Sequence, residues 1–103
     1  MHFQLARLLE SLEAAGLLAG QRGPLPDEVH GLTDDSRSVE PGSIFLAVRG
    51  SARDGHDYLA KAAEKGASVA MVEDPERTAI PVIIVREGRK AAAVAAGTAY
   101  GDP

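Results

Sequence analysis

At the centre of the chain stands the sequence Ile44-Phe45-Leu46-Ala47-Val48, an unbroken apolar run just after the turn dipeptide Pro41-Gly42. Such a run is too short for a helix and is typical of a strand that is buried on both faces of a sheet. Two similar runs follow, Val69-Ala70-Met71-Val72 and Val82-Ile83-Ile84-Val85. These runs predict a sheet in the interior of a small domain.

Helix patterns separate and flank these predicted strands. Residues 57–66 predict a helix, with Asp57 as the N-cap and Gly66 just after the last turn. Leucines that recur every three or four positions predict a second helix over residues 2–16, and the alanine-rich segment 87–99 favours a third. Helices that alternate with buried strands indicate layers of helix packed on sheet.

The remaining segments are predicted as connections, with one further strand. Glycines and prolines predict a loop over residues 20–26, and residues 29–32 predict a short strand. The link over residues 73–81 is shorter than the roughly dozen residues of a usual parallel crossover. We therefore expect the strand over residues 82–85 to be antiparallel to its predecessor or not to be its neighbour, and its direction stays open.

These elements predict an α/β fold, a small layered sheet of parallel or mixed strands flanked by helices. At least one right-handed βαβ unit is expected, over residues 44–72. The 103 residues fit a single domain. Within it, residues 1–23 are expected to form a helix and a loop, and residues 24–103 the α/β core.

The composition excludes several classes of protein. Hydrophobic residues make up 45% and charged residues 25% of the chain, which is typical of a globular domain, and only 4% are aromatic, so the core is aliphatic. A net charge of −4 argues against a nucleic-acid partner. Cysteine is absent, which excludes disulfides and a cysteine nucleophile. No run reaches the roughly 18 apolar residues of a membrane span, so we expect a cytoplasmic protein without a membrane partner.

Two polar clusters interrupt the aliphatic sequence, and the first is Thr33-Asp34-Asp35-Ser36-Arg37. It follows a predicted strand, and ligands of open α/β sheets bind at strand ends. Its carboxylates, hydroxyl and guanidinium suit a sugar or the edge of a base. The same residue types favour ordinary turns, because Asp and Ser bond their own backbone. Spacing alone favours the turn.

The second cluster, residues 50–57, links a buried strand to a helix. Its glycines let the backbone approach a ligand, and the N–H groups of the helix start suit a phosphate, with Arg53 as a charge-assisted donor. The alternative is a plain connection in which Asp54 or Asp57 caps the helix, and spacing supports both equally. We expect His56 to cap or pack rather than to act as a base. Neither a phosphate-binding nor a metal-binding motif is present, so no catalytic or metal-ligating residue is expected.

Several ordered motifs resemble the N-terminal domain of Mur ligases, most closely those of the MurE type. The resemblance covers about residues 29–103, whereas residues 1–28 share only a leucine-bearing helix. The motifs are Asp35-Ser36-Arg37, Pro41-Gly42-Ser43-Ile44-Phe45-Leu46-Ala47, Asp54-Gly55-His56-Asp57-Tyr58, Gly66-Ala67 and the tail Tyr100-Gly101-Asp102-Pro103, which favours the MurE type.

The resemblance implies a domain of an ATP-dependent ligase of peptidoglycan synthesis, a UDP-N-acetylmuramoyl-tripeptide synthetase. Such enzymes add meso-diaminopimelate or L-lysine to UDP-N-acetylmuramoyl-L-alanyl-D-glutamate, with ATP and Mg²⁺. By this resemblance, the chain binds the UDP part of that substrate. Its ATP-binding and C-terminal domains then lie outside this sequence, and the chain alone, without a cofactor, is inactive.

The same resemblance implies roles for individual residues. Contacts to the UDP moiety are implied for Asp34, Ser36, Ser51, Ala52 and Arg53, and a loop-shaping role for Asp54, Gly55 and His56. Within the family, the alternative is a MurF-type ligase, which adds D-alanyl-D-alanine. The alternative of another class is a non-catalytic interaction module with the same fold, as in the N-terminal domain of HPr kinase.

Overall fold

The computed structural model describes residues 3–50 and 53–100. Its α-helices are α1 (Leu5–Ala14), α2 (Leu59–Glu64) and α3 (Gly88–Ala99). Its strands are β1 (Phe3–Gln4), β2 (Leu18–Arg22), β3 (Glu28–Val29), β4 (Leu32–Thr33), β5 (Ile44–Leu46), β6 (Val69–Val72) and β7 (Val82–Val85). Short 3-10 helices are η1 (Ser36–Ser38), η2 (Gly55–Tyr58) and η3 (Pro75–Arg77).

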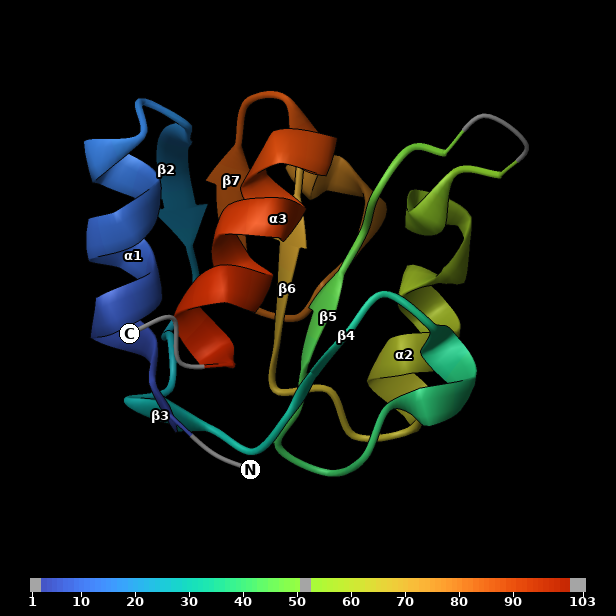
Figure 1. The fold of residues 1–103 in the computed structure, drawn as a ribbon. Coiled ribbons are helices and arrows are strands. Elements are labelled where there is room, and N and C mark those ends of the chain that lie inside the picture. The colour runs from blue at the N-terminus through green and yellow to red at the C-terminus, as the bar shows by residue number, and fades with distance from the viewer. Residues whose placement is uncertain (1–2, 51–52, 101–103) are drawn as a thin grey trace.

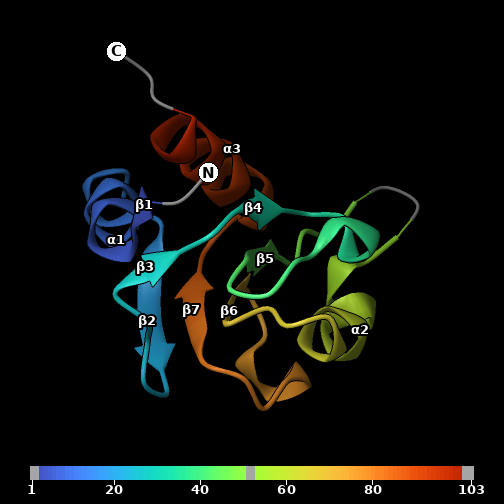
Figure 2. The ribbon, with the colours of Figure 1, turned by 90° about the horizontal axis from the view of Figure 1, so that it is seen from below.

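The main sheet has the strand order β2-β7-β6-β5-β4 (Figure 1). Strands β4 to β7 are parallel to their neighbours, and β2 is antiparallel to β7. Helices α1 and α3 cover one face of this sheet and α2 covers the other (Figure 2). The prediction of an α/β fold, with a sheet of mixed strands flanked by helices, is confirmed.

The core lies in two layers, one on each face of the sheet. Alternate side chains of a strand point to opposite faces, so each central strand serves both layers. In β5, Ile44 and Leu46 pack in the layer shared with α1 and α3. Phe45 packs in the other layer, against Leu59 and Ala62. All three residues of β5 are buried, which confirms the prediction of a strand buried on both faces.

The N-terminal segment differs from the prediction. The helix expected over residues 2–16 begins only at Leu5, because Phe3 pairs with Val29 in a small separate sheet. The loop expected over residues 20–26 is wrong at its start, since β2 runs to Arg22 and pairs with β7. The backbone groups of β7 need partners along its outer edge, and this pairing overrides the weak strand propensity of the segment. The segment expected as helix and loop therefore belongs to the sheet and the core.

The single strand expected over residues 29–32 is divided in two. Val29 ends β3 in the small sheet, and Leu32 begins β4 in the main sheet. Between them, Gly31 has a φ of +121°, a conformation open to glycine but costly for other residues. The chain turns there from one sheet to the other.

The strand over residues 82–85 is parallel to β6 and is its direct neighbour. The expectation of an antiparallel or distant strand was wrong. The short link of residues 73–81 contains η3 and brings the chain back to the end of the sheet at which β6 begins, so β7 runs in the same direction as β6.

The helix after the second polar cluster also starts differently. Asp54 rather than Asp57 caps its first turn, while Gly66 follows its end with a φ of +102°, as predicted.

Candidate functional site

The two polar clusters meet in one open hollow. The carboxyl ends of neighbouring parallel strands lie side by side at one end of a sheet. The first cluster follows the carboxyl end of β4, and the second follows that of its neighbour β5. The hollow has a volume of about 570 Å³. Its lining residues are Asp34, Asp35, Ser36, Arg37, Val48, Gly50, Arg53, Gly55, Tyr58 and Lys61.

One wall of the hollow is stabilised by the pair Asp35 and Arg37. The Asp35 carboxylate accepts from the backbone N–H of Arg37 at 2.9 Å and thereby caps η1. It also accepts two bonds from the Arg37 guanidinium, Nε to Oδ1 at 3.1 Å and Nη2 to Oδ2 at 2.9 Å. This hydrogen bonding lowers the pKa of Asp35 and raises that of Arg37. Arg37 therefore already has a carboxylate partner, and its side chain is 85% exposed.

Asp34 and Ser36 have their polar groups available to a ligand. Ser36 is only 7% exposed, yet it lines the hollow. Within residues 3–50 and 53–100, the Ser36 hydroxyl and the exposed Asp34 carboxylate have no hydrogen-bond partner. In the first cluster, Asp35 therefore builds a turn, as one of the two interpretations expects, while Asp34 and Ser36 line the hollow.

The second wall lies between β5 and η2 and includes Gly50, Arg53 and Gly55. Gly50 N–H donates to the Arg53 carbonyl at 2.6 Å, and Gly55 N–H donates to the Val48 carbonyl at 2.8 Å. These bonds close the loop and place Arg53 at the hollow. The exposed Arg53 guanidinium has no carboxylate partner in the described part of the chain. The predicted contact residues Ser51 and Ala52 lie outside the described residues.

Gly55 lies so close to the end of β5 that no side chain fits there. A Cβ atom at this position would lie 2.6 Å from the backbone nitrogen of Val48 and 2.9 Å from its carbonyl oxygen. These are backbone atoms, which cannot move aside as a flexible side chain can. Glycine at this position therefore permits the close approach of the loop to β5.

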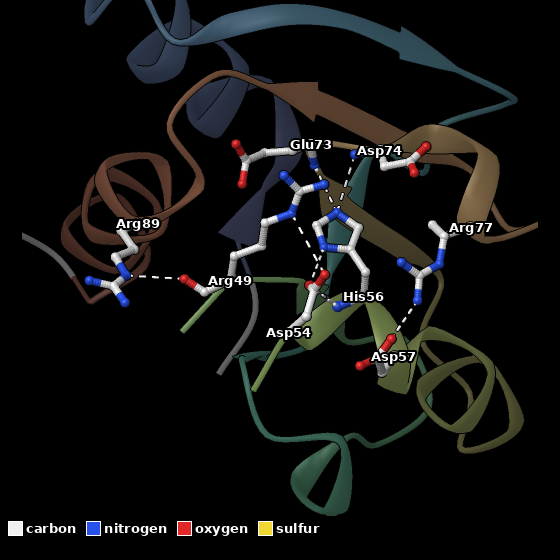
Figure 3. Close-up of polar contacts among 8 residues, drawn as sticks. All are labelled: Arg49, Asp54, His56, Asp57, Glu73, Asp74, Arg77 and Arg89. Carbon is white, nitrogen blue, oxygen red and sulfur yellow. Dashed lines mark hydrogen bonds and ion pairs between the residues drawn. The ribbon is translucent and has the colours of Figure 1, made fainter. Parts of the chain in front are cut away.

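His56 connects this loop to the turn after β6 (Figure 3). Its side chain is fully buried, with Nδ1 2.7 Å from Asp54 Oδ1. Its Nε2 accepts from the backbone N–H groups of Glu73 at 3.1 Å and Asp74 at 3.2 Å. Asp54 also accepts from the backbone N–H of His56 at 2.9 Å, and this bond lowers the pKa of the Asp54 carboxyl. The Arg49 guanidinium lies 3.7 Å from the same carboxylate.

Three lining residues of the hollow were not predicted as site residues from the sequence: Val48, Tyr58 and Lys61. Tyr58 and Lys61 lie three positions apart at the start of the helix, so both project from one side of it. Within the described ranges, the exposed ammonium group of Lys61 makes no ion pair. The sequence contains a signal for these two residues, because their helical spacing directly follows the glycine-rich loop. The spacing by itself predicts only a helix.

Two kinds of feature are absent from the described residues. Residues 3–50 and 53–100 contain no group of three or more side chains that could hold a metal ion. No helix in the same ranges is long and apolar enough to cross a membrane.

The polar hollow lies at the carboxyl ends of the parallel strands β4 and β5, which is where α/β domains with open sheets bind their ligands. A family model described as "Mur ligase family, catalytic domain" matches residues 28–99. The chain belongs to the Mur ligase family.

Individual relatives agree with this membership. The chain is 39% identical over 100 residues to the UDP-N-acetylmuramoyl-L-alanyl-D-glutamate–2,6-diaminopimelate ligase of Bacillus licheniformis, covering 97% of this chain and 20% of the relative. The ligase of the same name from Geobacter metallireducens is 41% identical, with coverages of 96% and 18%. The solved MurF of Acinetobacter baumannii has a TM-score of 0.79 at 25% identity, with coverages of 95% and 21%. The chain thus spans about one fifth of the length of these relatives.

Proposed function

We propose that this chain is the domain that binds the UDP part of UDP-N-acetylmuramoyl-L-alanyl-D-glutamate in a ligase that adds a diamino acid to that substrate. The observation that carries the proposal is the hollow at the ends of β4 and β5, which both polar clusters share. Relatives named as diaminopimelate ligases are 34% to 44% identical to the chain, against 25% for the solved MurF, and this favours the MurE type.

The uridine end of the ligand fits the first wall. Uracil and ribose together present both donors and acceptors of hydrogen bonds. The Ser36 hydroxyl can donate or accept, and the Asp34 carboxylate accepts. Both groups have their hydrogen-bonding capacity available within the described residues, so binding does not break an existing contact.

The diphosphate fits the cations of the hollow. Three cationic side chains line it, and Asp35 already neutralises Arg37. Arg53 and Lys61 keep their charges without an anionic partner among the described residues, so we assign the phosphates to them. Ser51 and Ala52 complete the proposed contact set on the basis of family resemblance.

The proposal places the rest of the reaction outside this chain. ATP and Mg²⁺ belong to an ATP-binding domain elsewhere in the enzyme, which is the partner of this domain. We further propose that the chain is one domain of this enzyme and that the enzyme works in the cytoplasm, as Mur ligases do. The support is the family membership together with the coverage of about one fifth of each relative.

Calorimetric titration of the 103-residue chain with UDP and with ADP tests this function. The two nucleotides carry the same diphosphate and differ in the base, so tighter binding of UDP requires readout of uracil by the first wall. We expect UDP to bind more tightly than ADP. Equal affinities, or no binding of UDP, would overturn the proposed function. Magnesium-dependent turnover of ATP by the chain alone would contradict the assignment of ATP to another domain.

A further inference from the structure

Tyr58 differs from the other residues at the hollow, because it is the only aromatic side chain among the lining residues that the structure describes. The chain has two phenylalanines, two tyrosines and no tryptophan. Phe3 and Phe45 are buried in the core, and Tyr100 is exposed at the end of α3. A flat ligand in the hollow can therefore meet one aromatic ring, that of Tyr58.

The Tyr58 ring is supported by the core and still lines the hollow. It is half-buried and packs against the core layer that contains Leu59 and Ala62. A buried tyrosine hydroxyl usually has a hydrogen-bond partner, but that of Tyr58 has none within residues 3–50 and 53–100. The core thus holds the ring in place, while its remaining surface is available at the hollow.

Tyr58 lies close to the first wall, although it is part of η2. The 3-10 helix of that wall, η1, lies beside α2 in both views (Figure 1 and Figure 2). At the end of α2, the Lys65 ammonium donates to the Arg37 carbonyl at 3.3 Å. The pKa of Arg37 is raised mainly by its hydrogen bond with Asp35 and, as a smaller effect, by the nearby Tyr58. A ligand group at the Ser36 side of the hollow can therefore also reach the Tyr58 ring.

We propose that the Tyr58 ring is the platform on which the uracil of the ligand stacks, while Ser36 and Asp34 contact the edge of the same base. The inference deepens the proposed function and rests on it. Uracil is flat and uncharged, so hydrogen bonds satisfy its edge, whereas its faces favour an aromatic surface. Proteins commonly stack unpaired bases on aromatic side chains. Lys61 projects from the same side of the helix as Tyr58, so one nucleotide can place its base on Tyr58 and its diphosphate at Lys61.

A change in the ligand tests the platform without any change in the protein. In dihydro-UDP the carbon–carbon double bond of the uracil ring is saturated, so the base is puckered and stacks poorly. Its N–H, its two carbonyl oxygens and the diphosphate remain. We expect the wild-type chain to bind dihydro-UDP roughly tenfold more weakly than UDP in calorimetric titrations, the usual effect of losing one stacked base. Equal affinities would overturn the inference alone, whereas no binding of UDP would overturn the proposed function with it.

Two substitutions of Tyr58 separate the ring from the packing that supports it. Tyr58→Leu keeps an apolar side chain against the core but removes the ring, whereas Tyr58→Phe keeps the ring and removes only the hydroxyl. We expect Tyr58→Phe to bind UDP roughly tenfold more tightly than Tyr58→Leu. This difference should not depend on salt, because stacking of a neutral base involves no exposed charge. In Tyr58→Leu, UDP and dihydro-UDP should bind equally, since the platform is absent.

Tyr100→Leu is the matched control, because Tyr100 is exposed and does not line the hollow. It should bind UDP as the wild type does. If Tyr58 has only a structural role, Tyr58→Leu lowers the melting temperature but keeps the preference for UDP over dihydro-UDP, and the inference fails. An equal loss of affinity in Tyr58→Phe and Tyr58→Leu would assign the effect to the hydroxyl and would also overturn the platform.

Tyrosine fluorescence reports on the ring directly, even where Tyr58→Leu does not fold. In Tyr100→Phe, Tyr58 is the only tyrosine of a chain that has no tryptophan. Stacking of uracil should quench its emission, with half of the effect at the UDP concentration that half-saturates the chain in calorimetry. Tyr58→Phe, in which Tyr100 is the only tyrosine, gives the background from light that UDP absorbs. Bound UDP that leaves the emission of Tyr58 unchanged overturns the inference.

Discussion

At the scale of single residues, the cations of the hollow differ in what already neutralises them. Arg37 has a bidentate partner in Asp35, while Arg53 and Lys61 have none within the described residues. Arg53→Ala should therefore weaken UDP binding by roughly 1.5–3 kcal/mol, and Lys61→Ala should weaken it by less, because a single ammonium makes fewer directed bonds than a guanidinium.

Salt provides the internal check on these two substitutions. Exposed charges are screened, so the losses caused by Arg53→Ala and Lys61→Ala should shrink when ionic strength rises. Lys90→Ala is the matched control, because Lys90 is an exposed lysine of α3 that pairs with Glu87 at 3.2 Å and does not line the hollow. Titration at two ionic strengths measures all three variants. Losses that do not change with salt would contradict a phosphate contact.

The Ser36 hydroxyl is expected to act differently, because it carries no charge. Ser36→Ala removes one hydrogen-bonding group from a position that is only 7% exposed and lines the hollow. We expect UDP affinity to fall by roughly 0.5–1.5 kcal/mol, the usual net value of one hydrogen bond. The same titrations should show almost no dependence of this loss on salt. Unchanged affinity for UDP in this variant would remove Ser36 from the site.

At the scale of elements, the sequence predicts best the strands that are buried. β5, β6 and β7 are apolar runs, because both of their faces lie in the core, and the pattern is visible without knowledge of their neighbours. β2 has no such run, since all five of its residues are exposed or half-exposed. Its strand conformation comes from pairing with β7, which lies about sixty residues away in the sequence. A local pattern cannot show a partner at that distance.

The loop between β5 and η2 depends on Gly55. Gly55→Ala would place a Cβ atom 2.6 Å from the Val48 backbone nitrogen, so β5 or the loop must shift. We expect a loss of roughly 1–3 kcal/mol in the free energy of unfolding, the usual cost of overpacking. Gly20→Ala in β2 is the control, because its Cβ would meet only the end of the Ile84 side chain, at 3.9 Å. Urea denaturation of both variants measures this loss. Equal free energies of unfolding for the two variants would contradict the close approach of the loop to β5.

The carboxylate of Asp54, which caps η2, makes part of the free energy of unfolding depend on pH in the acid range. Hydrogen bonds from His56 lower the pKa of Asp54 below its ordinary 3.8. The folded state therefore favours the charged carboxylate, so this contribution is complete above about pH 4 and is lost as pH falls through the lowered pKa. Asp54→Asn should lower stability at pH 7 and reduce the further decrease toward pH 2.5. Denaturation curves between these pH values measure both effects, and a wild-type slope in the variant would contradict them.

At the scale of the whole molecule, both polar clusters of the site are visible in the sequence, but their proximity in the fold is not. Asp34, Ser36 and Arg53 stand in polar clusters that are visible as interruptions of an aliphatic pattern. They share one hollow because β4 and β5 are parallel neighbours. The sequence of β4 is too short to predict this pairing. Lys61 was missed for the same reason, since its exposed position resembles any solvated helix face until the first wall is placed opposite it.

The same topology leads us to expect that α1 and β2 are needed for the domain to fold. Leu5, Leu8 and Leu12 of α1 are almost completely buried in the layer over the sheet, and β2 covers the outer edge of β7. A chain that begins at residue 23 would expose this layer and leave the backbone groups of β7 unpaired on that side. We expect the 103-residue chain to melt in one cooperative transition and the shortened chain to show none.

Leu8→Ala provides a graded form of the same experiment. Leu8 is fully buried, so the substitution should lower the free energy of unfolding by roughly 2–5 kcal/mol. The chain should then keep its fold or lie near its limit of stability. Leu9→Ala, at the half-buried neighbouring position, should cost clearly less. Circular dichroism melts of the four chains give the comparison. A shortened chain that melts cooperatively near the temperature of the intact one would show that α1 and β2 are an addition to a core formed by residues 24–103, as the sequence pattern alone predicted.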